Sequence, residues 1–104
     1  MIQHIVLLKF KPAVFQETIA GLFAQLAQLQ PRIPGMTSFS GGPYTSDEGL
    51  NQGYTHSFII TFFIMTFIDA EARNHYLPHP EHQHVKTAIL PAVGDVIAFD
   101  FQGP

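Results

Sequence analysis

The spacing of apolar positions changes several times along the chain, and each change marks the boundary of an expected element. Residues 2–11 form a nearly continuous apolar run containing Val, Ile and Phe, which Pro12 ends; this predicts a strand buried on both faces. Over residues 13–29, apolar side chains recur every three or four positions, which predicts an amphipathic helix. Pro31 and the Ile-Pro-Gly of residues 33–35 end that helix.

The middle of the chain predicts two strands joined by a loop. Residues 36–45 form a weaker strand, whose Gly-Gly-Pro at 41–43 indicates a bulge or an edge position. Residues 46–53 are polar and contain glycine, so they are expected to form a loop. A third strand follows over residues 54–67.

The last third predicts two helical segments and a final strand. Asp69 can cap a helix over residues 70–77, which Pro78 interrupts. A second helix, with proline in its first turn, spans residues 80–90, and residues 95–101 form the last strand.

The resulting order, β-α-β-β-α-β, predicts an α+β, ferredoxin-like fold in one domain, residues 1–104. The helices would cover one face of the four-stranded sheet, yet the strands are apolar on both faces. Two sheets packed face to face, or closed into a barrel, would cover the second face, so we expect a homodimer, a dimeric α/β barrel.

Composition supports this expectation and excludes several classes of partner. Apolar residues make up 46% of the chain, and charged residues only 12%, where about 25% is usual. The net charge is −3 and there is no Lys/Arg cluster, so neither nucleic acid nor an anionic membrane is expected as a partner. The longest apolar run, residues 57–68, is too short to span a bilayer as a helix, which needs about 20 residues.

The chain contains no cysteine, which excludes disulfides, thiolate nucleophiles and cysteine-based zinc sites. The first residues lack the basic leader and the small-residue cleavage site of a signal peptide. Both features favour a cytoplasmic location.

Four of the six histidines lie in the ten residues HYLPHPEHQH, 75–84. His79 precedes Pro80, where its ring can accept hydrogen bonds from the first amides of a helix, so a structural role is the simpler interpretation. His75 and His84 have polar neighbours and are interpreted as surface residues.

Three other side chains are harder to assign from the residues alone. His82 would face the turn that carries Tyr76, and a neutral imidazole beside a phenol is either a base with an orienting donor or a packed surface histidine. His4 and His56 lie between apolar neighbours in strands expected to be adjacent and central. They either line one inner face as ligand-binding groups or are core histidines with hydrogen-bond partners.

Five motifs, in this order, resemble the stress-responsive A/B barrel (Dabb) family: HIVLLKFK, IPGM, GYTH, YLPHPEH and VIAFDF. The resemblance runs nearly end to end and implies a ferredoxin-like dimeric α/β barrel. Similarity to a polyketide cyclase of this family implies a general-base role for His82, a pocket tyrosine at Tyr76, and substrate-binding roles for His4 and His56. It also implies that His79 is structural.

The sequence departs from the family pattern in one place. FIITF at 58–62 is followed at once by the near copy FIMTF at 63–67, which adds about five residues before the YLPHP element. An odd shift turns the side chains of a strand to the opposite face. Either a bulge absorbs these residues, or the strand and the loop after it are longer.

Two functional hypotheses follow. The first is a cofactor-independent lyase or polyketide-cyclase-like enzyme, in which His82 acts as base with Tyr76, and His4 and His56 bind polar groups of a small apolar or aromatic substrate. The alternative is a non-catalytic stress-response or ligand-binding barrel, and a weaker one is a cofactor-independent monooxygenase-like barrel. No cofactor is expected, and no metal site either, because there is no HExxH motif and prolines flank His79.

Overall fold

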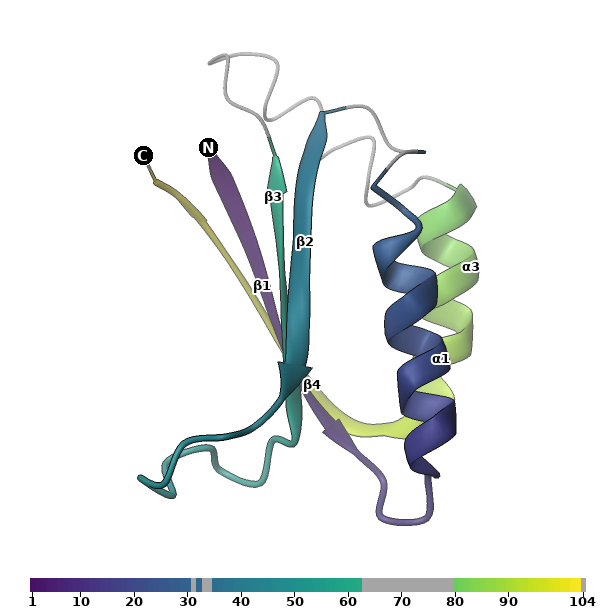
Figure 1. Ribbon diagram of the computed structural model, residues 1–104, viewed down its shortest axis with the longest axis vertical. Coiled ribbons are helices and arrows are strands. Elements are labelled where there is room, and N and C mark those ends of the chain that lie inside the picture. The colour runs from purple at the N-terminus through teal and green to yellow at the C-terminus, as the bar shows by residue number, and fades with distance from the viewer. Residues whose placement is uncertain (31, 33–34, 63–79, 104) are drawn as a thin grey trace.

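The structure, a computed structural model, describes residues 1–30, 32, 35–62 and 80–103, with residues 80–82 described by their backbone alone. A four-stranded antiparallel sheet carries two helices on one face (Figure 1). The predicted ferredoxin-like α+β fold is therefore confirmed. In chain order the elements are β1 (Ile2–Phe10), α1 (Gln16–Ala27), β2 (Met36–Pro43), β3 (His56–Phe62), α3 (Pro80–Ile89), the short 3-10 helix η1 (Leu90–Ala92) and β4 (Val93–Gln102).

The sheet has the strand order β2-β3-β1-β4. The first and third strands are central, as predicted, and β1 is hydrogen-bonded to a strand on each side. Because all three pairings are antiparallel, side chains of paired residues point to the same face of the sheet. The register of β1 therefore decides which side chains of its two neighbours meet the helices.

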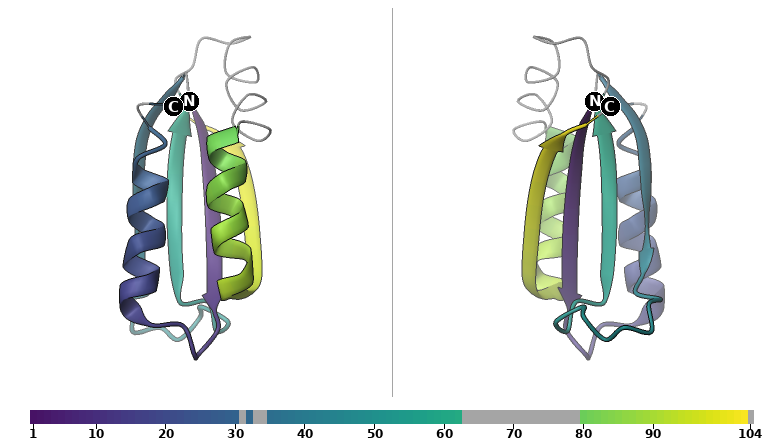
Figure 2. Two further views of the ribbon diagram at one scale, coloured as in Figure 1. Left: turned by 90° about the vertical axis from the view of Figure 1, so that its right-hand side faces the viewer. Right: turned by 90° about the vertical axis from the view of Figure 1, so that its left-hand side faces the viewer.

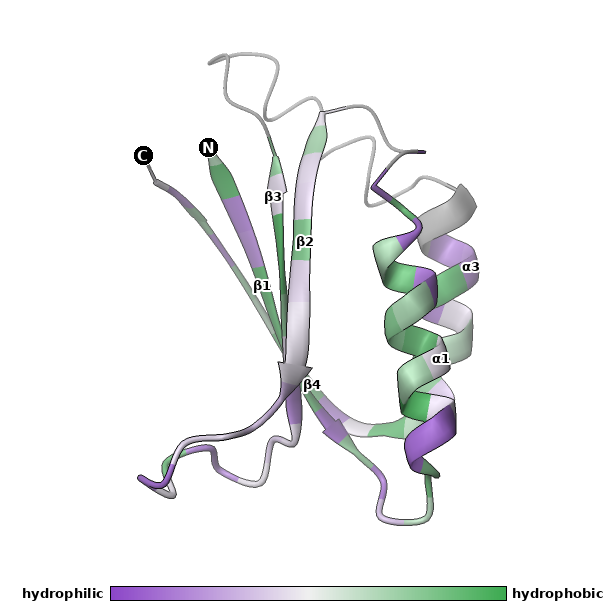
Figure 3. Ribbon diagram, in the orientation of Figure 1, coloured by the Kyte–Doolittle hydropathy of each residue, from purple (hydrophilic) through white to green (hydrophobic). Residues whose placement is uncertain are grey.

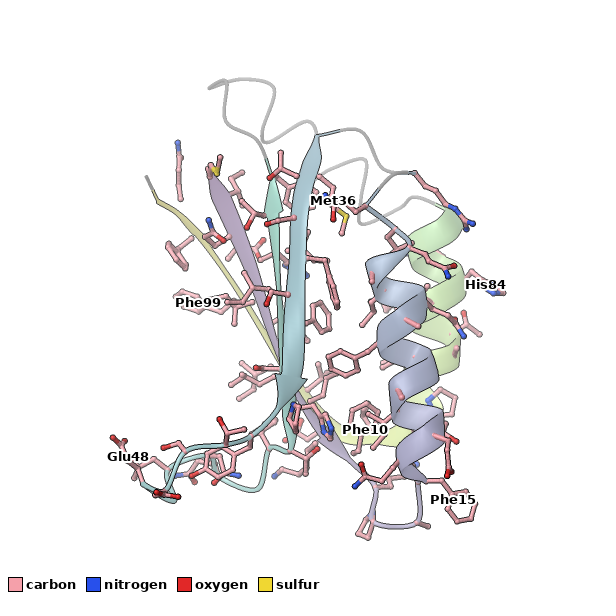
Figure 4. The ribbon with its side chains drawn as sticks, viewed as in Figure 1. Phe10, Phe15, Met36, Glu48, His84 and Phe99 are labelled. Carbon is pink, nitrogen blue, oxygen red and sulfur yellow. The ribbon has the colours of Figure 1, made fainter. Side chains whose placement is uncertain are left out.

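The hydrophobic core lies between the sheet and the two helices. Every second residue of β1, from Ile2 to Phe10, is buried, and the amphipathic stripes of α1 and α3 pack on this face. Figure 4 shows Phe10 and Met36 between the sheet and the helices, and Figure 3 shows apolar positions along both. Side chains that are almost fully buried include Leu8, Leu26, Leu29, Ile60 and Phe62.

The opposite face of the sheet is uncovered in the single chain (Figure 2, right). Its residues on β1 are only half-buried, so the prediction that this strand is buried on both faces is wrong for one chain alone. Neighbouring strands add exposed apolar side chains, with Ile59, Ile97 and Phe99 exposed by 39%, 44% and 63%. Figure 4 shows Phe99 pointing away from the helices.

The predicted element boundaries differ from the observed ones mainly at turns. The helix predicted over 13–29 begins at Gln16, because the chain first makes a turn in which the Val14 amide donates to the Lys11 carbonyl at 3.1 Å. β3 is observed from His56 to Phe62. Residues 54 and 55 of the strand predicted over 54–67 precede the observed strand. Residues 63–67 of that strand, and the helix predicted over 70–77, lie outside the described residues.

β2 is an edge strand, as its Gly-Gly-Pro segment predicted, but its bulge lies elsewhere. The register with β3 shifts between Met36 and Ser38, not at the glycines. Gly41 instead allows a close approach. A Cβ built there would lie 2.7 Å from Phe58 Cβ, 2.8 Å from Phe23 Cε1 and 2.8 Å from the Ser57 carbonyl. The missing side chain lets two aromatic rings pack directly on the strand.

We therefore predict that Gly41→Ala lowers the free energy of unfolding by about 1–3 kcal/mol, the range typical of overpacking. Gly42→Ala is the matched control, because a Cβ at the next residue meets nothing within 4 Å. It should change stability by no more than about 0.5 kcal/mol. Urea denaturation of the two variants measures both values, and equal effects would contradict the role given to Gly41.

Candidate functional site

A histidine–carboxylate pair joins the central strand to the edge strand β4. His4 and Asp100 are directly opposite one another in the β1–β4 ladder, and His4 Nδ1 lies 2.5 Å from Asp100 Oδ1. The His4 residue is 7% exposed, and the Asp100 side chain 29%. An ionised carboxylate only accepts hydrogen bonds, so Nδ1 of His4 donates to Asp100, which fixes the orientation of the ring.

His4 lines a cavity of about 220 Å³ between the sheet and α3, which we call the His4 cavity. The polar side chains lining it, among the described residues, are those of His4 and Lys86. Lys86 is exposed, so its aliphatic stem can form part of the wall while its charge stays at the solvent-facing rim. The other walls are apolar and include Val6, Leu8, Phe58, Val85, Ile89 and Val96.

Sequence reasoning missed Asp100 and Lys86. Asp100 lies in the last strand, on the same face as the cavity-lining Ala98 and Val96. The ferredoxin-like strand order makes the first and last strands neighbours, so a polar residue on each could have been tested for pairing. Lys86 follows the buried Val85 and precedes the buried Ile89 on the same helix. This position hints that Lys86 borders the cavity, but less clearly than the strand order hints at the His4–Asp100 pair.

His56 begins β3 and is half-buried. Its Nδ1 is 2.9 Å from Thr55 Oγ1, and its ring packs edge-on against Phe10, with 5.1 Å between the ring centroids. Burial lowers the pKa of His56 below 6.5, because an apolar environment disfavours the charged imidazolium. His56 is therefore neutral at pH 7.

His4 and His56 point to the same face of the sheet, as predicted, but they line different cavities. His56 is opposite Leu8, four positions from His4 along β1, or about 13 Å at the rise of a strand. Phe58 lies between them, with its centroid 6.5 Å from that of His4. His56 lines a second cavity of about 310 Å³, between α1 and β2, which we call the α1–β2 cavity.

The structure gives little information on His82 and Tyr76, the two residues predicted to be catalytic. His82 is in the first turns of α3, three positions before Val85, and its side chain is outside the description. Tyr76, His75 and His79 lie outside the described residues altogether. His84 is exposed on α3, as predicted, and points outward in Figure 4.

In the part of the chain that the structure describes, no three His, Asp or Glu side chains come together as a metal site would require. No helix within the described ranges has the length and apolar character needed to cross a membrane.

Comparison with known proteins assigns the chain to a family. The model of the Stress responsive A/B Barrel Domain matches residues 2–102. A relative from Arabidopsis thaliana, the stress-response A/B barrel domain-containing protein HS1, is 35% identical over 101 residues, which are 97% of this chain and 88% of that protein.

Solved structures share the fold over almost the whole chain. A crystal structure of an Arabidopsis thaliana protein has a TM-score of 0.88 with 34% identity and covers 100% of this chain and 96% of its own. A dimeric ferredoxin-like protein of unknown function from Jannaschia sp. CCS1 has a TM-score of 0.84 with 25% identity, and the match covers 98% of each chain. The hydroxynitrile lyase from Passiflora edulis has a TM-score of 0.84 with 20% identity over 96% of this chain and 90% of its own, a likeness of fold alone.

The lowered pKa of His56 predicts a pH dependence of stability. The unfolded state binds a proton near pH 6.5 and the folded state only at lower pH, so this contribution to stability is present above 6.5 and is lost as the pH falls through the folded pKa. We expect His56→Phe to lose less stability than the wild type between pH 7.5 and pH 5, as measured by urea denaturation. His84→Phe, which changes an exposed histidine, should keep the wild-type slope. If both variants kept it, His56 would not be the responsible group.

Proposed function

The chain belongs to the stress-responsive A/B barrel family, and on this basis we propose that it is a homodimeric barrel that binds a small, largely apolar ligand in the His4 cavity and acts on it without a cofactor. The observation that carries this proposal is that a single buried polar side chain lies among the apolar walls of the cavity. An apolar space of about 220 Å³ contains one buried imidazole that a carboxylate holds in a fixed orientation. Apolar cavities with a few fixed polar groups are typical ligand sites.

The geometry supports a division of roles within this cavity. The apolar walls hold the carbon skeleton of the ligand. His4, oriented by Asp100, forms a hydrogen bond with a polar group of the ligand. The charge of Lys86 at the rim favours a ligand oxygen that carries or develops negative charge.

For the chemical step we propose that His82 is the base and that Tyr76 orients it or holds a substrate oxygen. His82 removes a proton from a carbon next to a carbonyl group, the electron pair of the broken C–H bond forms the enolate, and the negative charge moves to the oxygen. Support comes from the family resemblance of the YLPHPEH element and from the backbone, because position 82 precedes the cavity-lining Val85 by one helical turn. His56, in a different cavity, is left out of this step.

The second candidate is a ligand-binding barrel without turnover. It is favoured by the polar side chains described in the His4 cavity, which are His4, held by Asp100 from outside the cavity lining, and Lys86 at the rim; such groups are sufficient to bind a polar ligand group. Proton removal separates the two candidates, because binding alone leaves the C–H bonds of a ligand intact.

Exchange of the methyl protons of acetophenone for deuterium in D2O, followed by NMR, tests the proposed base. We expect His82→Ala to lower the protein-dependent exchange rate by about 10²–10⁴-fold, the usual contribution of a general base, with little change in melting temperature. His84→Ala is the matched control on the same helix and should leave the rate unchanged. Binding of acetophenone with no protein-dependent exchange would instead support the non-catalytic barrel.

The homodimer is supported by the uncovered sheet face. Register places Ile5, Leu7, Ile97 and Phe99 together on the face opposite the helices, and an apolar area of this kind is unusual on a monomer. The Jannaschia protein with the same fold is dimeric. A face-to-face pair of sheets would bury these side chains.

We predict that Phe99→Asp converts a dimer of twice 11.6 kDa into an 11.6 kDa monomer in sedimentation at micromolar concentration. A carboxylate on this face would be buried without a partner in the dimer, which is strongly unfavourable. Phe15→Asp is the control, because Phe15 is 74% exposed at the start of α1, away from the open face (Figure 4). Its mass should remain that of the dimer. A monomeric wild type would overturn the proposed assembly.

A single domain over residues 1–104 and a cytoplasmic location also remain proposals. The family match over residues 2–102 supports the first. The absence of cysteine from the sequence is consistent with the second.

A further inference from the structure

The loop between β2 and β3, residues 44–55, extends beyond the end of the sheet on the side away from the helices (Figure 1). It therefore projects on the side of the uncovered face. In a face-to-face pair of sheets the partner's sheet would lie about 10 Å from this face. A loop that projects in this direction comes next to the end of the partner's sheet.

Hydrogen bonds within the chain hold the loop in one conformation. The Gly49 amide donates to the Tyr44 hydroxyl at 2.9 Å. The Tyr54 amide donates to the Asn51 carbonyl at 2.9 Å, and Asn51 Nδ2 donates back to the Tyr54 carbonyl at 2.8 Å. Between them Gln52 has a φ of 54°, a left-handed conformation that residues with a side chain adopt rarely. A loop that is already ordered loses little conformational entropy when it binds another surface.

The outer part of this loop carries an apolar side chain and two carboxylates. Leu50 is 71% exposed, and Asp47 and Glu48 are exposed beside it. Figure 4 shows Glu48 at the outer end of the loop, pointing away from the sheet. Neither carboxylate forms an ion pair with another described residue. Covering Leu50 with a second surface would bury apolar area and stabilise whatever complex did so.

Strand β1 brings two lysines to the same end of the sheet. The Thr55 amide, at the end of the loop, donates to the Leu8 carbonyl at 2.9 Å, so the loop and the end of β1 are neighbours. Lys9 packs on its own chain, with its Nζ 4.7 Å from the centroid of the Tyr54 ring. Lys11 is exposed and forms no ion pair with another described residue. Lys11 is therefore the better placed of the two to meet a carboxylate of a second molecule.

Charge distinguishes the two symmetric ways of packing the sheets face to face. A two-fold axis across the strands would bring the loop to the opposite end of the partner, where the Met1 ammonium already donates to the Gly103 carbonyl at 2.7 Å. An axis along the strands brings it to the same end, and the strand order β2-β3-β1-β4 then puts it beside the partner's β1 and β4. Lys9, Lys11 and Asp95 lie at that end, one cation more than carboxylates. They would face a loop with two carboxylates, which is an attractive arrangement.

We propose that the β2–β3 loop is a docking element for a second copy of this chain. Glu48 forms an ion pair with Lys11 of the partner subunit, and Leu50 packs beside that pair on the first residues of the partner's β4. Symmetry makes each contact occur twice. The inference rests on the proposed homodimer and adds to it the direction of the two-fold axis and a polar contact outside the apolar sheet face.

Cross-linking tests which residues meet, because the natural chain has no cysteine and engineered thiols react alone. A mixture of Glu48→Cys and Lys11→Cys, treated with a short bis-maleimide, should give a covalent dimer of twice 11.6 kDa on a denaturing gel. Glu48→Cys mixed with Gln28→Cys, an exposed position at the end of α1, should give none. A link from Glu48→Cys to Gly103→Cys instead would place the loop at the opposite end of the partner and overturn the proposal.

Exchange of the two charges tests whether the contact is an ion pair. Glu48→Lys and Lys11→Glu should each raise the dissociation constant of the dimer about 2- to 30-fold, the value of two exposed ion pairs. The double variant should return to the wild-type value. Glu17→Lys, which makes the same change of net charge in the first turn of α1, should leave the constant unchanged. A monomeric wild type in sedimentation would overturn the homodimer itself. A wild-type dimer in which neither single variant weakens association, or in which the double variant is no tighter than the single ones, would overturn the loop contact alone.

Discussion

The antiparallel pairing of β1 with both β3 and β4 determines where the polar side chains of the sheet can lie. His4 meets Asp100 only because the β1–β4 register places them opposite one another. The β1–β3 register turns His56 to the same face but four positions away. A shift of either register by one residue would turn these side chains to the uncovered face. The two cavities are thus a consequence of backbone pairing, and the helices only close them.

Much of the fold could be predicted from the sequence because it depends on local periodicity and on the β-α-β-β-α-β order of elements, which is typical of the ferredoxin-like fold. The apolar run of β1 and the helical stripe containing Leu22 and Leu26 are read directly from spacing. The boundary at Gln16 was missed, because it depends on a hydrogen-bonded turn before the helix. The bulge at Met36 was also missed, since the glycines nearby gave a stronger but misleading signal. The role of Gly41, which allows the close approach of Phe23 and Phe58, is a tertiary property.

The candidate site was less predictable, because it too depends on tertiary contacts between distant parts of the chain. Sequence could identify His4 and His56 as polar groups among apolar neighbours, and strand order could place them on one face. It could not show that Phe58 divides them, or that Asp100 pairs with one and Thr55 with the other. These partners give two identical side chains different chemistry. Asp100 holds the ring of His4 in one orientation, whereas burial in an apolar setting lowers the pKa of His56.

The pairing that joins β1 to β4 also sets the order in which the protein can fold. The residues of the His4–Asp100 pair are separated by 96 positions, so this contact closes a loop of nearly the entire chain and forms late. Until β4 arrives, β1 has one unpaired edge flanked by apolar side chains, which is the kind of surface that pairs with other chains. Newly made molecules are consequently most vulnerable to aggregation while the central strand waits for its last partner. Variants that weaken β4 would then be lost through poor yield before any change in activity could be observed.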